Sequence, residues 1–178
     1  DMPHWYFRVS GCREGKRCAP VASDYIFDEL PFYQPKHNSL YVKELKWQRG
    51  VFCRFGMKGV IAENHFDGER NFLTVLGGER RYILAHPNQG DKMALFPPGH
   101  PLARHSAVDW SDPDLEAFPE FAAARGNEVV LQAGDSLFVP SLWFHTIISL
   151  SLNMQCNTRS GLDPKYFKDV EQCGYDSM

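Results

Sequence analysis

Two residues that could bind a metal stand close together, His65 and Asp67, with only Phe66 between them. In a β-strand, residues i and i+2 point to the same face, so the imidazole and the carboxylate would project into one cavity. A second histidine, His145, follows a turn, an apolar strand and Pro140. Two imidazoles and one carboxylate form the open-sided site of non-haem Fe(II) oxygenases. We therefore predict that His65, Asp67 and His145 are metal ligands.

The segments that would position these ligands have the pattern of short strands and turns. Residues 71–76 form an apolar strand, Gly77-Gly78 suits a two-residue hairpin turn, and residues 80–84 form the returning strand. Many short strands with glycine turns indicate a mainly β barrel or sandwich, in which distant residues can meet. Further strands are expected at residues 5–9, 51–55, 128–132 and 136–139, and residues 146–157 suit one long strand or a hairpin pair.

A segment with a different pattern, residues 87–128, interrupts the β-strands. We expect a helix that begins near Pro113, because proline is favoured at the first helical position and Ser111 or Asp112 could cap it. Pro119 would split that helix into two short pieces. The insert could be a lid or a substrate wall, and its alternative role is packing across the end of the barrel.

The composition describes one globular domain. The chain has 178 residues, of which 43% are hydrophobic, and a formal net charge of −3, which gives no reason to expect nucleic acid as a partner. No apolar run approaches the roughly 20 residues that a membrane helix needs. No signal-peptide pattern opens the sequence, which starts at Asp1, so we expect a processed or trimmed piece.

The five cysteines include no Cys-x-x-Cys pair, which argues against a structural zinc site. Two alternatives stay open for their state. Cys12 and Cys18 could form a disulfide in a secretory lumen, or all the cysteines could be free thiols in an intracellular protein. We expect the intracellular location, with the lumen as the alternative.

Taken together, the motifs resemble those of the JmjC/cupin-8 family of Fe(II)- and 2-oxoglutarate-dependent oxygenases, and within it the small hydroxylase branch, similar to the asparaginyl hydroxylase of hypoxia-inducible factor. The resemblance covers a domain at residues 22–161, with an N-terminal extension at 1–21 and a C-terminal tail at 162–178. The matching blocks are Tyr25–Asp28, Gly56–Gly59, His65–Asp67 with Asn71-Phe72, Gly78–Leu84 with His86-Pro87, Trp110–Pro113 with Phe118–Phe121, Gly134–Pro140 with Trp143–His145, and Leu152-Asn153.

The resemblance implies a double-stranded β-helix of the cupin or jelly-roll type, with the helical insert between core strands. It implies Fe(II) on the three predicted ligands and 2-oxoglutarate as co-substrate, with Asn71 and Asn153 nearby as polar partners. The family usually has a lysine that binds the distal carboxylate of 2-oxoglutarate, and Arg80 stands at that position. Arginine can form a bidentate pair with a carboxylate, and Tyr82 would face the same side.

Several readings of these residues stay open. Alternation allows only one of Arg80 and Arg81 to face the cavity, and we predict Arg80. A tryptophan that often follows the late asparagine in the family is absent, and Gln155 stands there. Asn71, Asn153 and Gln155 could instead be ordinary hydrogen-bonded polar residues of a barrel.

The function that we expect is hydroxylation of a protein side chain, with release of succinate and CO2. One alternative is a catalytically inactive cupin-fold module with a binding or structural role. Another is a metal-dependent cupin dioxygenase that acts on a small molecule without 2-oxoglutarate. A protein or peptide substrate is favoured, a small molecule is possible, and we expect a monomer.

Overall fold

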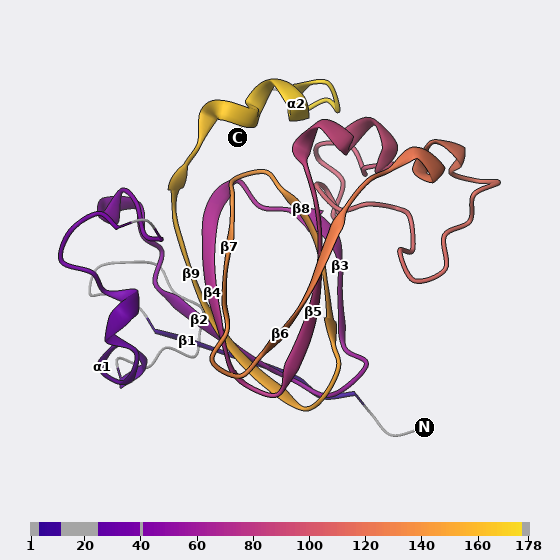
Figure 1. Cartoon of the computed structure of the whole chain (residues 1–178). Helices are drawn as coiled ribbons and strands as arrows, with labels where there is room; N and C mark the ends of the chain where they lie inside the picture. Colours follow the sequence, from indigo (N-terminus) through magenta and orange to yellow (C-terminus); the bar gives the residue numbers. More distant parts are fainter. Residues whose placement is uncertain (1–3, 12–24, 40, 176–178) are drawn as a thin grey trace.

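The computed structural model describes residues 4–11, 25–39 and 41–175. In this part of the chain, two antiparallel sheets form opposite walls of a flattened barrel (Figure 1). The five-stranded sheet has the order β1-β2-β9-β4-β7, and the four-stranded sheet has the order β3-β8-β5-β6. The strands are β1 (Tyr6–Gly11), β2 (Val51–Gly56), β3 (Ile61–Phe66), β4 (Glu69–Gly77), β5 (Glu79–Ala85), β6 (Asn127–Gln132), β7 (Ser136–Val139), β8 (Phe144–Ser149) and β9 (Asn153–Leu162).

Successive strands mostly cross from one sheet to the other, as β2 to β3, β3 to β4, and β7 to β8 to β9 do. This crossing confirms the predicted mainly β, cupin-type fold. It also puts residues from distant parts of the chain on one inner wall. Strand β1 pairs with β2 along its whole length, so residues 6–11 belong to the five-stranded sheet.

The predicted hairpin around Gly77-Gly78 is wrong in its pairing, although both strands exist. Strand β4 pairs with β7 and β9, whereas β5 pairs with β6 and β8, so the turn is a corner between the two sheets. Gly78 has a left-handed φ of 69°, and a Cβ there would clash with the backbone oxygen of Leu152. Only glycine fits this corner without strain, because the neighbouring backbone approaches too closely.

The segment 146–157 is likewise neither one strand nor a hairpin pair. Strand β8 pairs with β3 and β5, and β9 pairs with β2 and β4, so the chain changes sheets between Ser149 and Asn153. Both expectations failed for the same reason, because alternation of side chains predicts strands but does not identify their partners.

The α-helix that we expected from Pro113 does not form, although the segment is split at Pro119 into two short pieces, as predicted. Asp114 caps a single turn there by accepting hydrogen bonds from the backbone N–H groups of Glu116 and Ala117, both at 3.0 Å. Pro119 has no N–H group and begins a separate 3₁₀ turn, so no longer helix forms. In the described residues, no helix is long and apolar enough to cross a membrane. The helical elements are α1 (Tyr25–Glu29), α2 (Phe167–Glu171) and the 3₁₀ turns η1 (Pro31–Tyr33), η2 (Leu45–Trp47), η3 (Pro87–Lys92), η4 (Pro119–Ala123) and η5 (Pro164–Tyr166).

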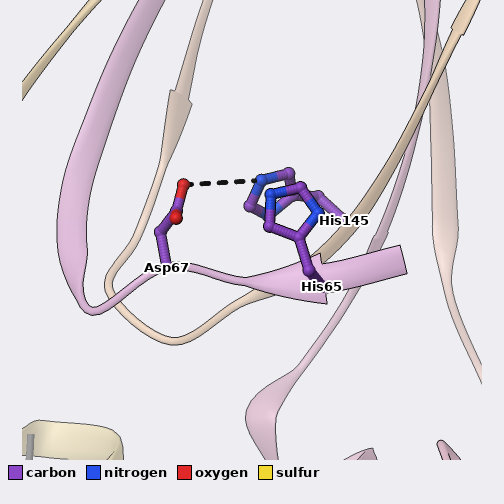
Figure 2. Close-up of side chains that lie close together, drawn as sticks. All are labelled: His65, Asp67 and His145. Atoms are coloured by element: carbon purple, nitrogen blue, oxygen red, sulfur yellow. Dashed lines mark ion pairs between the residues drawn. The ribbon is translucent and has the colours of Figure 1, made fainter. Parts of the chain in front are cut away.

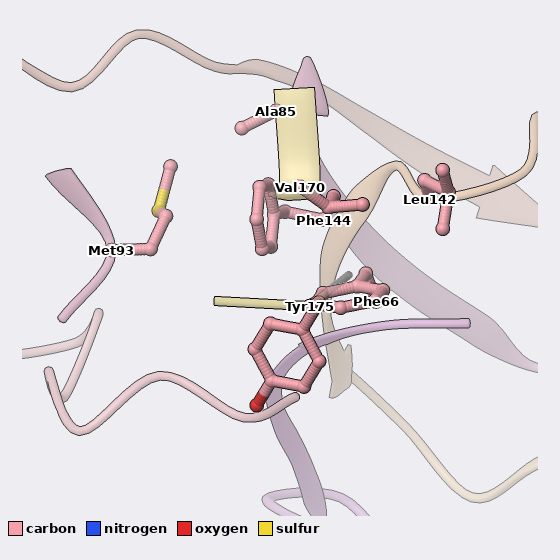
Figure 3. Packing of buried hydrophobic residues seen from close by; sticks show 7 residues of the cluster. All are labelled: Phe66, Ala85, Met93, Leu142, Phe144, Val170 and Tyr175. Carbon is pink, nitrogen blue, oxygen red and sulfur yellow. The ribbon is translucent and has the colours of Figure 1, made fainter. Parts of the chain in front are cut away.

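Buried apolar side chains close the barrel at the end where the C-terminal helix α2 lies (Figure 1). Phe66 and Phe144, which flank the predicted ligands on β3 and β8, pack edge to face with ring centroids 5.5 Å apart. Val170 of α2 and Tyr175 join them, as Figure 3 shows. This cluster holds the ends of β3 and β8 together beside the predicted site.

A second apolar cluster covers the outer face of the five-stranded sheet. Cys53 of β2 and Cys156 of β9 are cross-strand partners there and form a disulfide. Tyr33 packs beside them and donates a hydrogen bond to the backbone oxygen of Cys156 at 2.6 Å. This pair was not predicted, and it contradicts the alternative in which all the cysteines are free thiols. The Cys12–Cys18 alternative lies outside the described residues.

Candidate metal centre

The three predicted ligands come from two adjacent strands. His65 of β3 lies directly opposite His145 of β8 in the antiparallel register, and Asp67 follows the end of β3. Figure 2 shows the carboxylate facing the two imidazoles. One ligand atom from each residue lies within 4.8 Å of the other two. The structure therefore brings together the three residues that the sequence analysis singled out.

Hydrogen bonds to backbone carbonyl groups orient both imidazoles. Nδ1 of His65 lies 2.7 Å from the backbone oxygen of Glu63, and Nδ1 of His145 lies 3.0 Å from that of Trp143. A carbonyl oxygen can only accept, so Nδ1 carries the proton in each ring, and Nε2 keeps its lone pair. These carbonyl groups are partners that the sequence could not identify.

Burial keeps both imidazoles neutral. It lowers the pKa of His65 to about 3, with the neighbouring His145 acting in the same direction. Burial also lowers the pKa of His145. Neutral imidazoles are the form that binds a metal, so both rings are available as ligands at neutral pH.

Asp67 is buried but remains ionised. Burial has the largest effect on its pKa and raises it, but the positive charge of Arg159, with smaller contributions from the imidazoles and Arg104, leaves the pKa below its ordinary value. Nη2 of Arg159 lies 2.6 Å from Oδ2, and Nη1 of Arg104 lies 3.7 Å from Oδ1. Nε2 of His145 lies 3.8 Å from the same Oδ2.

The donor set fits a divalent iron ion. It offers two neutral nitrogens and one carboxylate from one side, which is the facial arrangement of non-haem Fe(II) sites. Oδ2 of Asp67 is buried and accepts no hydrogen bond of normal geometry within the described residues. Arg159 already provides one cationic partner for this oxygen, and the ionised carboxylate would also be available as a ligand for a metal.

A cavity of about 480 Å³, which we call the inner cavity, opens beside the three ligands. The inward faces of both sheets line it, with apolar side chains such as Leu73, Val139 and Ile147 between the polar ones. Its polar wall consists of Tyr6, Arg8, Arg54, His65, Asp67, Asn71, Arg80, Tyr82, His145, Ser149, Gln155, Asn157 and Arg159.

Arg80 points into the barrel, as predicted, and Arg81 points away from it. Arg80 is 3% exposed, whereas Arg81 pairs with Glu128 on the outer surface. Nη1 of Arg80 donates to Oε1 of Gln155 at 3.0 Å, and Nε donates to Oδ1 of Asn153. Within the described residues no carboxylate pairs with Arg80, so a buried guanidinium faces the inner cavity with neutral partners only.

Tyr82 lies on the same inward face as Arg80, as predicted. Its hydroxyl donates to Oε1 of Gln155, and burial raises its pKa to about 12. It is therefore a neutral hydrogen-bond donor under ordinary conditions. Arg80, Tyr82 and Gln155 form one connected network away from the metal ligands.

The two predicted asparagines lie at different places. Asn71 lines the inner cavity opposite Arg159 and accepts a hydrogen bond from Nδ2 of Asn157 at 2.8 Å. Asn153 contacts Arg80 instead and is not among the described residues that line the cavity. Positions 153 and 159 of β9 are six positions apart, which corresponds to roughly 20 Å along a strand.

The sequence analysis missed Asn157 and Arg159 as site residues. Both lie on the inward face of β9, two and four residues beyond Gln155. Their signal was alternation, because every second residue from Asn153 to Arg159 is polar or charged and buried or half-buried. The predicted site ended at Gln155 and did not extend this alternation to the next two inward positions.

A second cavity of about 800 Å³, the outer cavity, adjoins the metal centre. Arg159 lines both cavities, and Arg104 of the insert lines the outer one. This supports the prediction that the insert forms a wall near the site. Trp110 packs against Phe121 instead, and His105 stacks on His65 with ring centroids 4.9 Å apart.

Comparison with known proteins gives the family. The profile described as "Cupin-like domain" matches residues 15–159. The zebrafish (Danio rerio) protein named tRNA wybutosine-synthesizing protein 5 is 34% identical over 86% of this chain and 44% of its own length. Jumonji C domain-containing protein 5 of Drosophila melanogaster is 33% identical over 77% of this chain and 35% of its own length. Lysine-specific demethylase 8 of Xenopus tropicalis is 34% identical over 56% of this chain and 22% of its own length.

This chain spans less than half of the length of each of these relatives. Their names support the predicted JmjC and cupin grouping, and the narrower likeness to the asparaginyl hydroxylase stays a prediction. The matched segment includes the three predicted ligands and all strands except β1 and the last residues of β9. The chain therefore belongs to the cupin-like domain family.

Proposed function

We propose that this chain is an Fe(II)- and 2-oxoglutarate-dependent oxygenase that hydroxylates its substrate and releases succinate and CO2. The observation that carries the proposal is the meeting of His65, Asp67 and His145, with ligand atoms within 4.8 Å, on the wall of a cavity that also holds Arg80. The ligand set suits Fe(II), and a buried guanidinium without an acidic partner suits a dicarboxylate.

His65, Asp67 and His145 would hold the metal. When Fe(II) and 2-oxoglutarate are bound, they supply the activation of O2 and the oxidation. The chain prepares the ligands, because the carbonyl groups of Glu63 and Trp143 fix the protons on Nδ1. Arg159 keeps Asp67 ionised, so no proton has to leave the carboxyl group before a metal binds at neutral pH.

Arg80 would bind the distal carboxylate of the co-substrate. Asn153 and Gln155 already orient its guanidinium, so little freedom is lost when an anion binds. Tyr82 supports the same network through Gln155. Charge-assisted hydrogen bonds of this kind contribute about 1.5–3 kcal/mol, which corresponds to roughly 10- to 100-fold in affinity.

The substrate would approach through the outer cavity. A protein side chain is the substrate class expected from the sequence, and relatives named as lysine demethylases are consistent with it. A tRNA is the second candidate, because the relative that covers 86% of this chain is named for tRNA wybutosine synthesis. The hydroxylation chemistry would be the same in both cases, since the same metal and co-substrate would supply it.

Two alternatives predict different behaviour. A catalytically inactive module would bind neither metal nor 2-oxoglutarate productively. A cupin dioxygenase of a small molecule would bind metal but would not consume 2-oxoglutarate. Arg80 favours the proposal over the small-molecule dioxygenase, because its position suits an anionic co-substrate in the inner cavity.

The test is formation of succinate from 2-oxoglutarate by the purified chain with Fe(II) and O2, followed by mass spectrometry. We expect slow turnover without substrate, and at least about a 100-fold loss in Asp67→Asn and His145→Ala. His100→Ala, which removes an imidazole of the insert, is the matched control and should leave turnover unchanged. Metal binding without succinate formation would favour the small-molecule dioxygenase. The absence of both metal binding and succinate formation would favour the inactive module.

A further inference from the structure

The inner cavity carries more positive charge than its proposed ligands require. Four arginines line it, whereas Asp67 is the one carboxylate among the described residues of its wall. Arg159 pairs with that carboxylate. The other three, Arg8, Arg54 and Arg80, have no acidic partner within the described residues.

Two of these arginines are direct neighbours. Arg8 of β1 and Arg54 of β2 are cross-strand partners in register, and both side chains face the inner cavity. Like charges directly opposite each other destabilise a sheet. Neither Arg8 nor Arg54 is needed to neutralise a carboxylate of the fold, so the pair indicates a site for an anion.

The position of Arg54 links this pair to Arg80. Its guanidinium donates to Oδ1 of Asn157, and its backbone oxygen accepts from Nη2 of Arg80 at 3.4 Å. Burial is the main cause that lowers the pKa of Arg80, and the positive charge of Arg54 acts in the same direction. The charge of Arg54 is therefore felt by the network around Arg80.

We propose that Arg8 and Arg54 form a second anion subsite in the inner cavity, beside Arg80, and that the cavity binds small tricarboxylic acids. The inference rests on the proposed function, in which the metal and Arg80 take the two carboxylates of 2-oxoglutarate. A third carboxylate then meets Arg8 and Arg54. A tricarboxylate that spans Arg80 and this subsite occupies the space of the co-substrate and competes with it. The cavity, at about 480 Å³, lies within the range of small-molecule sites.

The test uses two probes that differ by one carboxylate. Glutarate and its 3-carboxy derivative, propane-1,2,3-tricarboxylate, are titrated into the metal-free chain by calorimetry, which avoids chelation of metal by the probes. We expect the tricarboxylate to bind roughly tenfold more tightly, as one additional charge-assisted pair would give. In Arg8→Gln and in Arg54→Gln, the affinities of the tricarboxylate and of glutarate should differ by no more than about twofold.

Two further variants separate the subsites. Arg80→Gln should weaken both probes to a similar degree, and Arg8→Lys, which keeps the charge, should retain part of the preference. Arg81→Gln is the control, because Arg81 lies one residue away on the outer surface. The side chain of Arg8 on β1 is exposed, so Arg8→Gln should leave the fold intact. This variant therefore tests the subsite even if Arg54→Gln fails to fold.

The outcomes distinguish this inference from the proposed function. If glutarate binds through Arg80 but the tricarboxylate binds no more tightly, the second subsite is refuted and the co-substrate assignment stands. If the preference for the tricarboxylate survives in Arg8→Gln, the subsite is likewise refuted. If Arg8→Gln abolishes binding of the tricarboxylate while Arg80→Gln leaves the binding of both probes unchanged, the subsite stands and the assignment of Arg80 to the co-substrate falls.

Discussion

Nη2 of Arg159 lies 2.6 Å from Oδ2 of Asp67, and the same oxygen lies 3.8 Å from Nε2 of His145. The arginine therefore supplies the counter-charge for a carboxylate that faces both imidazoles. Its side chain is 23% exposed and lines the inner and outer cavities. Arg159 thus links the proposed metal centre to the space that would receive a substrate.

The first prediction concerns this pair. Arg159→Gln should destabilise the metal-free chain by about 2 kcal/mol, because it leaves the buried carboxylate of Asp67 without its main partner. Added Mn(II) should restore more stability to the variant than to the original chain, since the metal becomes the missing counter-charge. Thermal unfolding with and without Mn(II) measures both effects, and Arg125→Gln, on the exposed surface, is the control. Equal stabilisation by the metal in both proteins would contradict this role.

The second prediction uses the adjacent arginines of β5. Arg80→Gln should raise the KM for 2-oxoglutarate by roughly 10- to 100-fold, because it removes the charge-assisted pair with the distal carboxylate. Arg81→Gln should leave KM within about twofold, since that side chain pairs with Glu128 outside the barrel. Steady-state kinetics of succinate formation gives both values. Similar KM values in the two variants would show that Arg80 does not bind the co-substrate.

The third prediction is a pH dependence of stability. Burial lowers the pKa of His65 to about 3, whereas an unfolded histidine titrates near 6.5, so the unfolded state binds the extra proton between these values. The stability is therefore fully present above about pH 6.5 and falls as the pH drops towards 3. We expect the free energy of unfolding to fall less steeply with decreasing pH in His65→Gln than in the original chain, by up to about 1.4 kcal/mol per pH unit. Urea unfolding at pH 7, 6 and 5 measures this slope. His37→Gln is the control, and an unchanged slope in His65→Gln would contradict the burial of this imidazole.

The fourth prediction concerns the corner between β4 and β5. Gly78→Ala should destabilise the chain by at least about 2 kcal/mol, because the left-handed φ of 69° and the contact with the Leu152 oxygen both oppose a Cβ. Gly77→Ala should cost less than about 1 kcal/mol, since a Cβ at that residue would have no neighbouring atom within 4 Å. Chemical denaturation compares the two. Equal effects would show that this corner tolerates a side chain.

The residues of the proposed metal centre could be predicted from their local spacing. His65 and Asp67 share a face because they lie two residues apart, and alternation correctly placed Arg80 inside and Arg81 outside. These conclusions needed only the geometry of one strand. The mainly β architecture could be predicted in the same way, because short apolar segments alternate with glycine turns along the chain.

The features that the sequence did not show depend on which strands become neighbours. The disulfide between Cys53 and Cys156 and the contact between Asp67 and Arg159 both join β9 to segments about 90 or more residues earlier. Local patterns do not contain that information, because the register of a strand is set by the packing of the whole sheet. The break at Pro119 was predicted, because a proline lacks the N–H group that a helix needs, but the piece before it forms a single turn and not an α-helix.

The central claim is that His65, Asp67 and His145 hold Fe(II) together with 2-oxoglutarate. The most direct measurement is an anaerobic titration of the purified chain with Fe(II), with and without 2-oxoglutarate, followed by visible absorption. We predict a weak charge-transfer band that requires both components, disappears in His65→Ala and shifts in Arg80→Ala, while Arg81→Ala leaves it unchanged. Binding of Fe(II) without such a band would contradict the role of 2-oxoglutarate, and absence of Fe(II) binding would contradict the metal centre itself.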